Sequence, residues 1–196
     1  DKEEATDIYL EKNGDEVSYG IAEFKEEAAG KEKVVFCQES NKEESAGNYV
    51  SSGKIAEDAT LGQMLQLGME FFDDEEPFFF MCEGGKIDWT AHANKVMPMI
   101  MDILEFDEAI AVAYEFYKKH PKETLIVVTA DHETGGTGVG YMSYPVNEPQ
   151  GLKLNFSTKG HTGTAVPIFA YGAGAQRFAG IFQNRELPGI IEDLMK

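Results

Sequence analysis

The stretch TLIVVTADHE, residues 124–133, decides the fold. Its apolar and β-branched part, 124–130, stops abruptly at Asp131-His132-Glu133, as a strand buried on both faces does. A second apolar run, PFFFMC at 77–82, stops in the same way at Glu83-Gly84-Gly85. Between them, apolar residues at helical spacing predict a helix from about 99 to 119, the length that a crossover between parallel strands requires. We therefore predict that 77–82 and 125–130 are parallel strands of one α/β sheet.

Weaker signals predict the remaining elements. His120-Pro121 ends the long helix, and Thr60 is placed to cap an earlier one. The further predictions are a strand at 34–36, a helix at 61–72, a strand at 166–171, a terminal helix at 188–195, and loops with one hairpin at 135–160. The first segment, 1–57, is acidic and weakly patterned, and we expect a single domain over 1–196.

Composition excludes several classes of protein. The 196 residues are 42% hydrophobic and 27% charged, which is typical of a globular domain. A net charge of −18 opposes binding to nucleic acid or to anionic membranes. No apolar run approaches the roughly 20 residues that span a bilayer, and the opening DKEEATD has no feature of a secretory signal. Because the chain begins without Met, we expect it to be a piece of a longer protein.

Two cysteines, Cys37 and Cys82, are too few for a disulfide scaffold. Each lies at the end of an apolar run, so buried thiols are the simpler prediction, with a Cys37–Cys82 bridge as the alternative. The methionines at 97, 99 and 101 are interpreted as core or interface residues.

Chemistry-bearing side chains lie beside the predicted strands. In α/β sheets, ligands bind outside the carboxyl ends of strands. Asp88 and His92 are four residues apart, so a helix would place both on one face. Asp131 and His132 follow the strand at 125–130, and His161 precedes the strand at 166–171. Each pattern alone also suits a turn, a helix-surface pair or a cap, but together they favour a metal site.

The donor types indicate which metals the site would take. Carboxylate and imidazole together suit zinc. Glu83, an oxygen donor with no histidine beside it, suits magnesium better. His120 instead suits the negative end of a helix dipole.

Three segments resemble the C-terminal metal-ligand segments of the alkaline phosphatases, in the order of that family. They are EGGKIDWTAHAN (83–94), LIVVTADHETGG (125–136) and GHTG (160–163) followed by VPIFAYGAGAQRFAG (166–180). The resemblance is strong from about Thr60 onward and faint before it. It implies part of an alkaline phosphatase-like fold, a three-layer sandwich with a largely parallel central sheet flanked by helices.

The resemblance also implies a two-zinc and one-magnesium site. The first zinc would be held by Asp88, His92 and His161, the second by Asp131 and His132, and the magnesium by Glu83. In this family the phosphate of a phosphate monoester bridges the zinc pair, and a serine attacks phosphorus before hydrolysis by zinc-bound hydroxide.

Several parts of the family pattern are absent from these 196 residues. No Asp-Ser-Ala-like nucleophile segment, phosphate-clamping arginine, bridging aspartate or further magnesium ligand has a counterpart here; Ser40, Ser45, Ser51 and Ser52 lie in unsuitable contexts, and the arginines are Arg177 and Arg185. We therefore expect no catalytic residue in this chain and no activity of the chain alone. Trp89 stands where some relatives carry a basic or imidazole side chain near magnesium and phosphate. The short stretch between His132 and His161 leaves little room for a lid.

Other functions stay open at this point. The chain could be a non-catalytic metal-binding or interaction module, or belong to a phosphomutase, sulfatase or phosphodiesterase, although Glu83-Gly84-Gly85 before Asp88 favours a phosphatase. The resemblance implies a possible homodimer and a periplasmic or extracellular location. If the chain lacks the N-terminal half of its protein, exposed strand edges would favour self-association.

Overall fold

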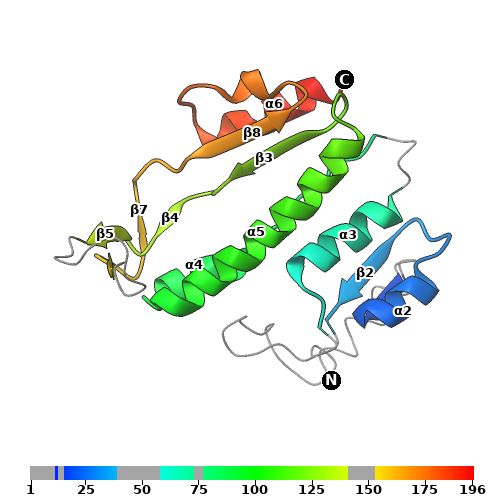
Figure 1. Ribbon diagram of the computed structural model, residues 1–196, viewed down its shortest axis with the longest axis horizontal. Helices are drawn as coiled ribbons and strands as arrows, with labels where there is room; N and C mark the ends of the chain where they lie inside the picture. Colours follow the sequence, from blue (N-terminus) through cyan, green and yellow to red (C-terminus); the bar gives the residue numbers. More distant parts are fainter. Residues whose placement is uncertain (1–11, 13–15, 39–57, 73–76, 141–152) are drawn as a thin grey trace. The chain divides into compact units, whose positions relative to one another are not determined.

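The computed structural model describes residues 12, 16–38, 58–72, 77–140 and 153–196 (Figure 1). Contacts divide the chain into two compact units, 1–82 and 83–196. The single domain expected over 1–196 therefore stays a prediction. The serines at 40, 45, 51 and 52 lie outside the described residues.

The first unit begins with two strands joined by a helix. β1 (Glu16–Tyr19) pairs in parallel with β2 (Val34–Cys37), and α2 (Gly20–Glu27) connects them. Phe24 of α2 is buried and meets the Phe36 ring edge-on, with ring centroids 5.6 Å apart. The strand predicted at 34–36 is confirmed, whereas β1 and α2 were not predicted because short, charged segments carry weak periodicity.

α3 (Leu61–Phe71) matches the predicted helix at 61–72. Thr60 caps it as expected: its hydroxyl accepts from the Gln63 backbone N–H, and the Gln63 side chain accepts from the Thr60 N–H. This reciprocal capping box satisfies two backbone donors that the helix leaves unpaired. Leu65 and Leu67 form its buried face.

The prediction of a strand at 77–82 is wrong. These residues form no strand, and none of the described strands pairs with them. Their aromatic rings pack instead: Phe72 stacks on Phe78 at 5.4 Å and meets Phe80 edge-on at 6.0 Å between ring centroids. The run is only partly buried, since Phe79 and Met81 are exposed, and a strand would also need a neighbouring backbone to pair with.

Cys37 and Cys82 are free thiols, each partly buried. Burial raises the pKa of the Cys82 thiol, because the thiolate loses hydration. The prediction of free thiols rather than a bridge is confirmed, although the two thiols are only partly buried and not fully buried as expected.

The second unit opens with two helices. α4 (Gly85–His92) is the helix expected around Asp88 and His92, and α5 (Val96–Lys119) starts three residues before the predicted 99. Asn94 makes the turn between them with φ 55°, a left-handed conformation that Asn tolerates. The buried hydroxyl of Thr90 on α4 lies 2.9 and 3.0 Å from the carbonyls of Lys86 and Ile87, and it also contacts the buried carboxylate of Asp102 on α5 at 3.4 Å.

The three methionines near the start of α5 differ in their exposure to solvent. Met99 is buried, as a core residue should be, while Met97 and Met101 are exposed. His120 is the C-cap of α5, and its backbone N–H donates to the carbonyls of Phe116 and Tyr117. The interaction of its side chain with the helix dipole stays a prediction.

The long strands of this unit pair antiparallel. β3 (Leu125–Thr129) and β8 (Ile168–Gly172) confirm the predicted strands at 124–130 and 166–171, and Leu125 lies opposite Gly172. Because 77–82 is not a strand, the parallel pairing expected for β3 is also wrong for the described residues. The fold is α/β, and the larger parallel sheet stays a prediction.

Short strands extend both β3 and the segment before β8. β4 (Glu133–Thr134) pairs antiparallel with β7 (His161–Thr162), and β5 (Gly138–Gly140) pairs with β6 (Lys153–Asn155), the hairpin expected within 135–160. The chain ends in two 3-10 turns, η3 (Ala175–Phe178) and η4 (Asn184–Glu186), and α6 (Leu187–Leu194), which confirms the predicted terminal helix. Among the described helices, none has the length and apolar character needed to cross a membrane.

Candidate metal centre

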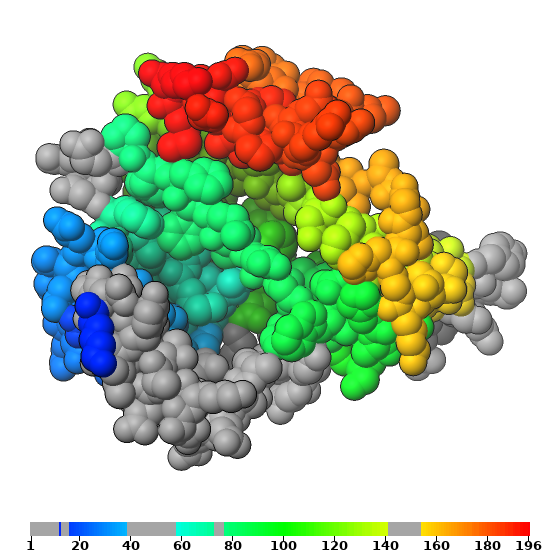
Figure 2. Space-filling model, turned by 180° about the vertical axis from the view of Figure 1, so that it is seen from behind, coloured from blue at the N-terminus to red at the C-terminus, as the bar shows by residue number. Residues whose placement is uncertain are grey.

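Three predicted ligands converge where α4 meets β7. Asp88 and His92 project from one face of α4, and His161 comes from β7. The Nε2 atoms of His92 and His161 are 3.1 Å apart, and Asp88 carboxylate oxygens lie 3.4 Å from His92 Nε2 and 3.7 Å from His161 Nε2. Among the described residues, these three make up the group of His, Cys, Asp and Glu that could share one metal ion. Figure 2 shows the segment around β7, in yellow, against the green start of α4 and α5.

These separations suit tetrahedral zinc. Zinc bonds of about 2.0–2.1 Å in a tetrahedron place ligand atoms about 3.3 Å from one another. The 3.1 Å between the two Nε2 atoms and the 3.4 Å from Asp88 Oδ2 to His92 Nε2 lie close to that value, whereas the 3.7 Å contact to His161 Nε2 is made by the other Asp88 oxygen, Oδ1. Three protein ligands with one open position is the donor set of catalytic zinc sites, whereas structural sites use four. The residues present therefore fit a zinc ion with one open coordination position.

A hydrogen bond at Nδ1, the ring nitrogen away from the other ligands, holds the orientation of His92. Its Nδ1 lies 2.5 Å from the carbonyl oxygen of Lys159, so Nδ1 carries the proton and donates to that carbonyl. Nε2 is then left with its lone pair toward Asp88 and His161. Metal-binding histidines typically donate a hydrogen bond from the second ring N–H to a carbonyl or carboxylate oxygen.

Thr134 joins the two predicted zinc ligand sets. Its hydroxyl donates to Asp88 Oδ1 at 2.5 Å, so its oxygen is available to accept from His132 Nδ1, 3.2 Å away. In the neutral His132 ring, Nε2 is then the nitrogen that carries the lone pair. The His132 ring stacks on His161 with ring centroids 3.6 Å apart. One threonine therefore orients Asp88 of the first set and His132 of the second.

Asp131 and His132 form a more exposed pair at the end of β3. Asp131 Oδ2 lies 3.3 Å from His132 Nε2, again close to the spacing of two zinc ligands. Asn184 of η4 donates to the Asp131 carbonyl at 2.6 Å and holds this turn. The Asp131 side chain is 84% exposed, so this side of the centre is open.

Glu83 lies outside the group of three. It precedes α4, whose N-cap is Gly84, and it is exposed. Its role as a magnesium ligand therefore stays a prediction that rests on its sequence context.

Trp89 follows Asp88 on α4 and is 46% exposed. The Lys86 ammonium lies 3.6 Å from the centre of the Trp89 ring, a cation–π contact. Burial lowers the pKa of Lys86, and the opposing charge of Asp102 partly offsets that effect. An aromatic surface and a cation thus stand on the helix that carries Asp88 and His92.

Glu133 lies on the other side of β4. Its carboxylate accepts from the Thr162 hydroxyl and from the backbone N–H groups of Thr137 and Gly136, and these bonds hold the pKa of Glu133 below its ordinary value. Gly135 and Gly136, with φ of 87° and 57°, make the turn that brings those N–H groups to the carboxylate.

The family model for alkaline phosphatase matches residues 43–155, more than half of the chain. The chain belongs to the alkaline phosphatase family. All the predicted ligands except His161 lie within the matched region.

Curated relatives and solved structures of alkaline phosphatases agree. Alkaline phosphatase 4 of Bacillus subtilis is 25% identical over 187 residues, covering 63% of this chain and 40% of the relative. The alkaline phosphatase of Escherichia coli K12 is 31% identical over 142 residues, covering 65% and 30%. The structure of the enzyme from the Antarctic bacterium TAB5 has a TM-score of 0.80 and 33% identity, covering 95% of this chain and 53% of that one. A TAB5 variant solved with magnesium gives the same TM-score at 31% identity, covering 95% and 54%.

This chain thus spans 40% or less of these curated relatives and about half of the TAB5 chain. Sequence reasoning named the candidate ligands but missed the side chains that orient them. Thr134 carries one available signal, since it lies two residues after His132 and a strand there would place both on one face. The Lys159 carbonyl gives no signal in the sequence, because every residue has a backbone carbonyl.

Proposed function

We propose that the protein carrying this chain hydrolyses phosphate monoesters at a centre of two zinc ions and one magnesium ion. The observation that carries the proposal is the convergence of Asp88, His92 and His161 at separations that suit zinc. Membership of the alkaline phosphatase family and the magnesium named for the TAB5 variant support it.

Each predicted ligand has a place in this proposal. The first zinc would be held by Asp88, His92 and His161, the second by Asp131 and His132, and the magnesium by Glu83. Bound there, the ions would supply Lewis-acid stabilisation of phosphoryl oxygens.

The chain's own residues contribute orientation and charge. Lys159 and Thr134 hold the protons on Nδ1 of His92 and His132, so each Nε2 is free to bind a metal. Asp88 brings negative charge that offsets the charge of a cation. The exposed Asp131 side leaves room for a substrate to approach, and we propose that Trp89 lies near magnesium and phosphate.

We propose that the serine nucleophile comes from sequence outside these 196 residues, so the chain alone is inactive. Catalytic groups that act as a unit fail together when one is removed. In the whole protein we also propose a larger, largely parallel sheet between helix layers, because a sheet of two strands, such as β3 and β8, is marginal alone. A periplasmic or extracellular location and a homodimer are proposed from the family.

Hydrolysis of p-nitrophenyl phosphate tests the proposal in two preparations supplied with zinc and magnesium. The first is the 196-residue chain alone, for which we expect the rate of the metal-only blank. The second is Bacillus subtilis alkaline phosphatase 4 in which residues 60–196 of this chain replace the matched region. We expect this chimera, once circular dichroism shows that it is folded, to hydrolyse the ester and to stop when the metals are chelated.

A matched pair of variants completes the design. Asp88→Asn should abolish hydrolysis by the chimera, whereas Asp107→Asn, at an exposed position on α5, should leave it unchanged. A folded chimera that binds zinc without hydrolysing any ester would point to a non-catalytic metal-binding module. Preference for bis(p-nitrophenyl) phosphate or p-nitrophenyl sulfate would point to a phosphodiesterase or a sulfatase.

A further inference from the structure

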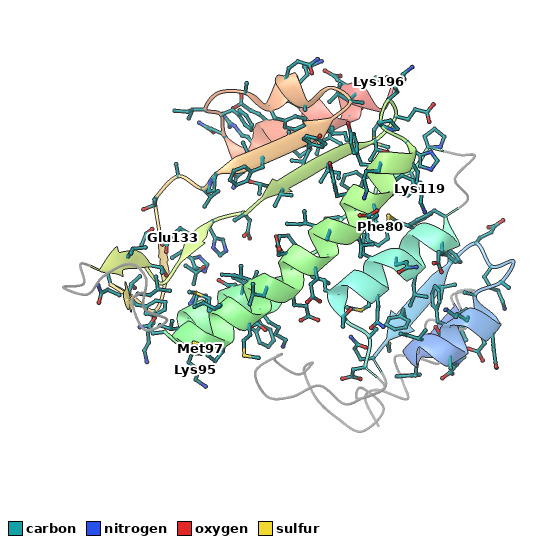
Figure 3. The ribbon with its side chains drawn as sticks, in the orientation of Figure 1. Phe80, Lys95, Met97, Lys119, Glu133 and Lys196 are labelled. Carbon is teal, nitrogen blue, oxygen red and sulfur yellow. The ribbon has the colours of Figure 1, made fainter. Side chains whose placement is uncertain are left out.

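The ladder of β4 and β7 has two faces with different contents. Glu133 pairs with Thr162 and Thr134 pairs with His161 in the antiparallel register. Successive side chains of a strand point to opposite faces. Thr134 and His161 therefore lie on the face of the metal centre, and Glu133 and Thr162 lie on the opposite face. Figure 3 labels Glu133 on this short strand.

The Glu133 carboxylate ties three pieces of backbone together on that opposite face. One oxygen accepts from the Thr162 hydroxyl at 2.5 Å, across the ladder. The backbone N–H groups of Gly136 and Thr137 donate to the same carboxylate at 3.2 and 2.9 Å, within the turn after β4. One side chain thus links β4, its turn and β7.

The ladder needs such a link because it is very short. Each strand has two residues, so few backbone hydrogen bonds hold their register. A slip of one residue would turn every side chain of β7 to the opposite face, and His161 would leave the metal centre. The Gly135 N–H donates to the Gly160 carbonyl at 2.9 Å, which ties the turn to the residue before His161.

We propose that Glu133 is a positioning residue that, through Thr162, holds β4 and β7 in the register that presents His161 to Asp88 and His92. This role rests on the proposed function, because positioning His161 matters only if the metal centre exists. The hydrogen bonds that define it are independent of any metal. It assigns no chemistry to Glu133, which faces away from the ligands.

Nuclear magnetic resonance of the metal-free 196-residue chain at pH 8 tests the role directly. The His132 and His161 rings are stacked, with centroids 3.6 Å apart, so their ring protons should show nuclear Overhauser contacts. We expect Glu133→Ala and Thr162→Val to lose these contacts. Thr162→Ser keeps the hydroxyl and should restore them. Glu123→Gln, at an exposed position in the turn after α5, is the control and should keep them.

Zinc affinity supplies a second measurement on the same proteins. A residue that orients a ligand typically contributes about 10- to 100-fold to metal affinity. We expect Glu133→Ala and Thr162→Val each to raise the zinc Kd by at least about tenfold. The double variant should be no weaker than the weaker single variant, because both remove the same link. Thr162→Ser and Glu123→Gln should bind zinc as the unchanged chain does.

The outcomes separate this proposal from the proposed function. Ring contacts that persist in both Glu133→Ala and Thr162→Val overturn the positioning role, even if the chain binds zinc. An unchanged chain that binds no zinc counts against the metal centre, while loss of the ring contacts in the two variants still supports the positioning of His161. Losses that multiply in the double variant would also overturn the role, since they would show that Glu133 and Thr162 act separately.

Discussion

Removal of His161 is the sharpest test of the metal centre. His161 joins the two ligands of α4 from a distant part of the sequence, so it contributes to the site only if the fold brings β7 to α4. Its Nε2 lies 3.1 Å from that of His92 and 3.7 Å from an oxygen of Asp88. These separations are close to the roughly 3.3 Å between zinc ligands, so zinc binding requires little rearrangement of the chain.

The size of the effect follows from the number of ligands. Four protein ligands bind structural zinc with about 10–16 kcal/mol at pH 7, or roughly 2.5–4 kcal/mol for each ligand. His161→Ala should therefore raise the zinc Kd by roughly 100- to 1,000-fold. The remaining Asp88 and His92 would hold zinc as two ligands on one helix face.

Calorimetric titration of zinc into the chelator-stripped chain measures this change, with a competing chelator to reach the tight range. The matched control is His120→Ala: His120 lies at the C-cap of α5 and stacks on Phe116, with ring centroids 4.7 Å apart. Circular dichroism checks that both variants keep the fold. A His161→Ala chain that binds zinc within about threefold of the unchanged chain would refute the reasoning, and so would an equal loss in His120→Ala.

Further predictions concern the surroundings of the centre. Thr134→Val removes the hydroxyl that contacts Asp88 and His132 and should raise the zinc Kd by about tenfold or more, measured by chelator competition; an unchanged Kd contradicts its orienting role. Gly172→Ala should lower the free energy of unfolding in urea by about 2 kcal/mol, because φ is 103° and a Cβ there would lie 2.2 Å from the Thr124 carbonyl; an equal urea midpoint contradicts this. The pKa of Glu133 is lower in the folded chain than its ordinary 4.5, so its contribution to stability is present above about pH 4.5 and lost as pH falls further. The urea midpoint of the unchanged chain should fall between pH 5 and pH 3, and in Glu133→Gln it should fall by less. An equal fall in both proteins would contradict this contribution of Glu133.

The sequence predicted the elements whose signal is local and repeated. α3 carries a cap at Thr60, α5 has a long apolar periodicity, and β3 is a β-branched run between polar residues, so each was located to within a few residues. The run at 77–82 has an equally strong apolar signal, and there the prediction failed. Whether a chain pairs as a strand depends on a partner backbone that no local pattern contains.

The same distinction applies to the candidate site. Asp88, His92 and His161 were named as candidate ligands because imidazole and carboxylate reveal their chemistry through residue type. Glu133 and the Lys159 carbonyl act through position, and position is a property of the fold. Successive side chains of β4 point to opposite faces of the ladder. Thr134 therefore faces the candidate ligands, whereas Glu133 faces away from them.

Because side chains alternate between the two faces, the position of His161 depends on the register of the short ladder of β4 and β7. α4 places Asp88 and His92 on one face, and Thr90 of that helix contacts Asp102 of α5. His161, by contrast, is held by a strand of two residues. The helix therefore sets where the ligands must meet, and the accuracy of the site is decided by what keeps β7 in register with β4. A chain can keep every ligand and still lose the metal if that register shifts, because a shift of one residue turns His161 to the opposite face of the ladder.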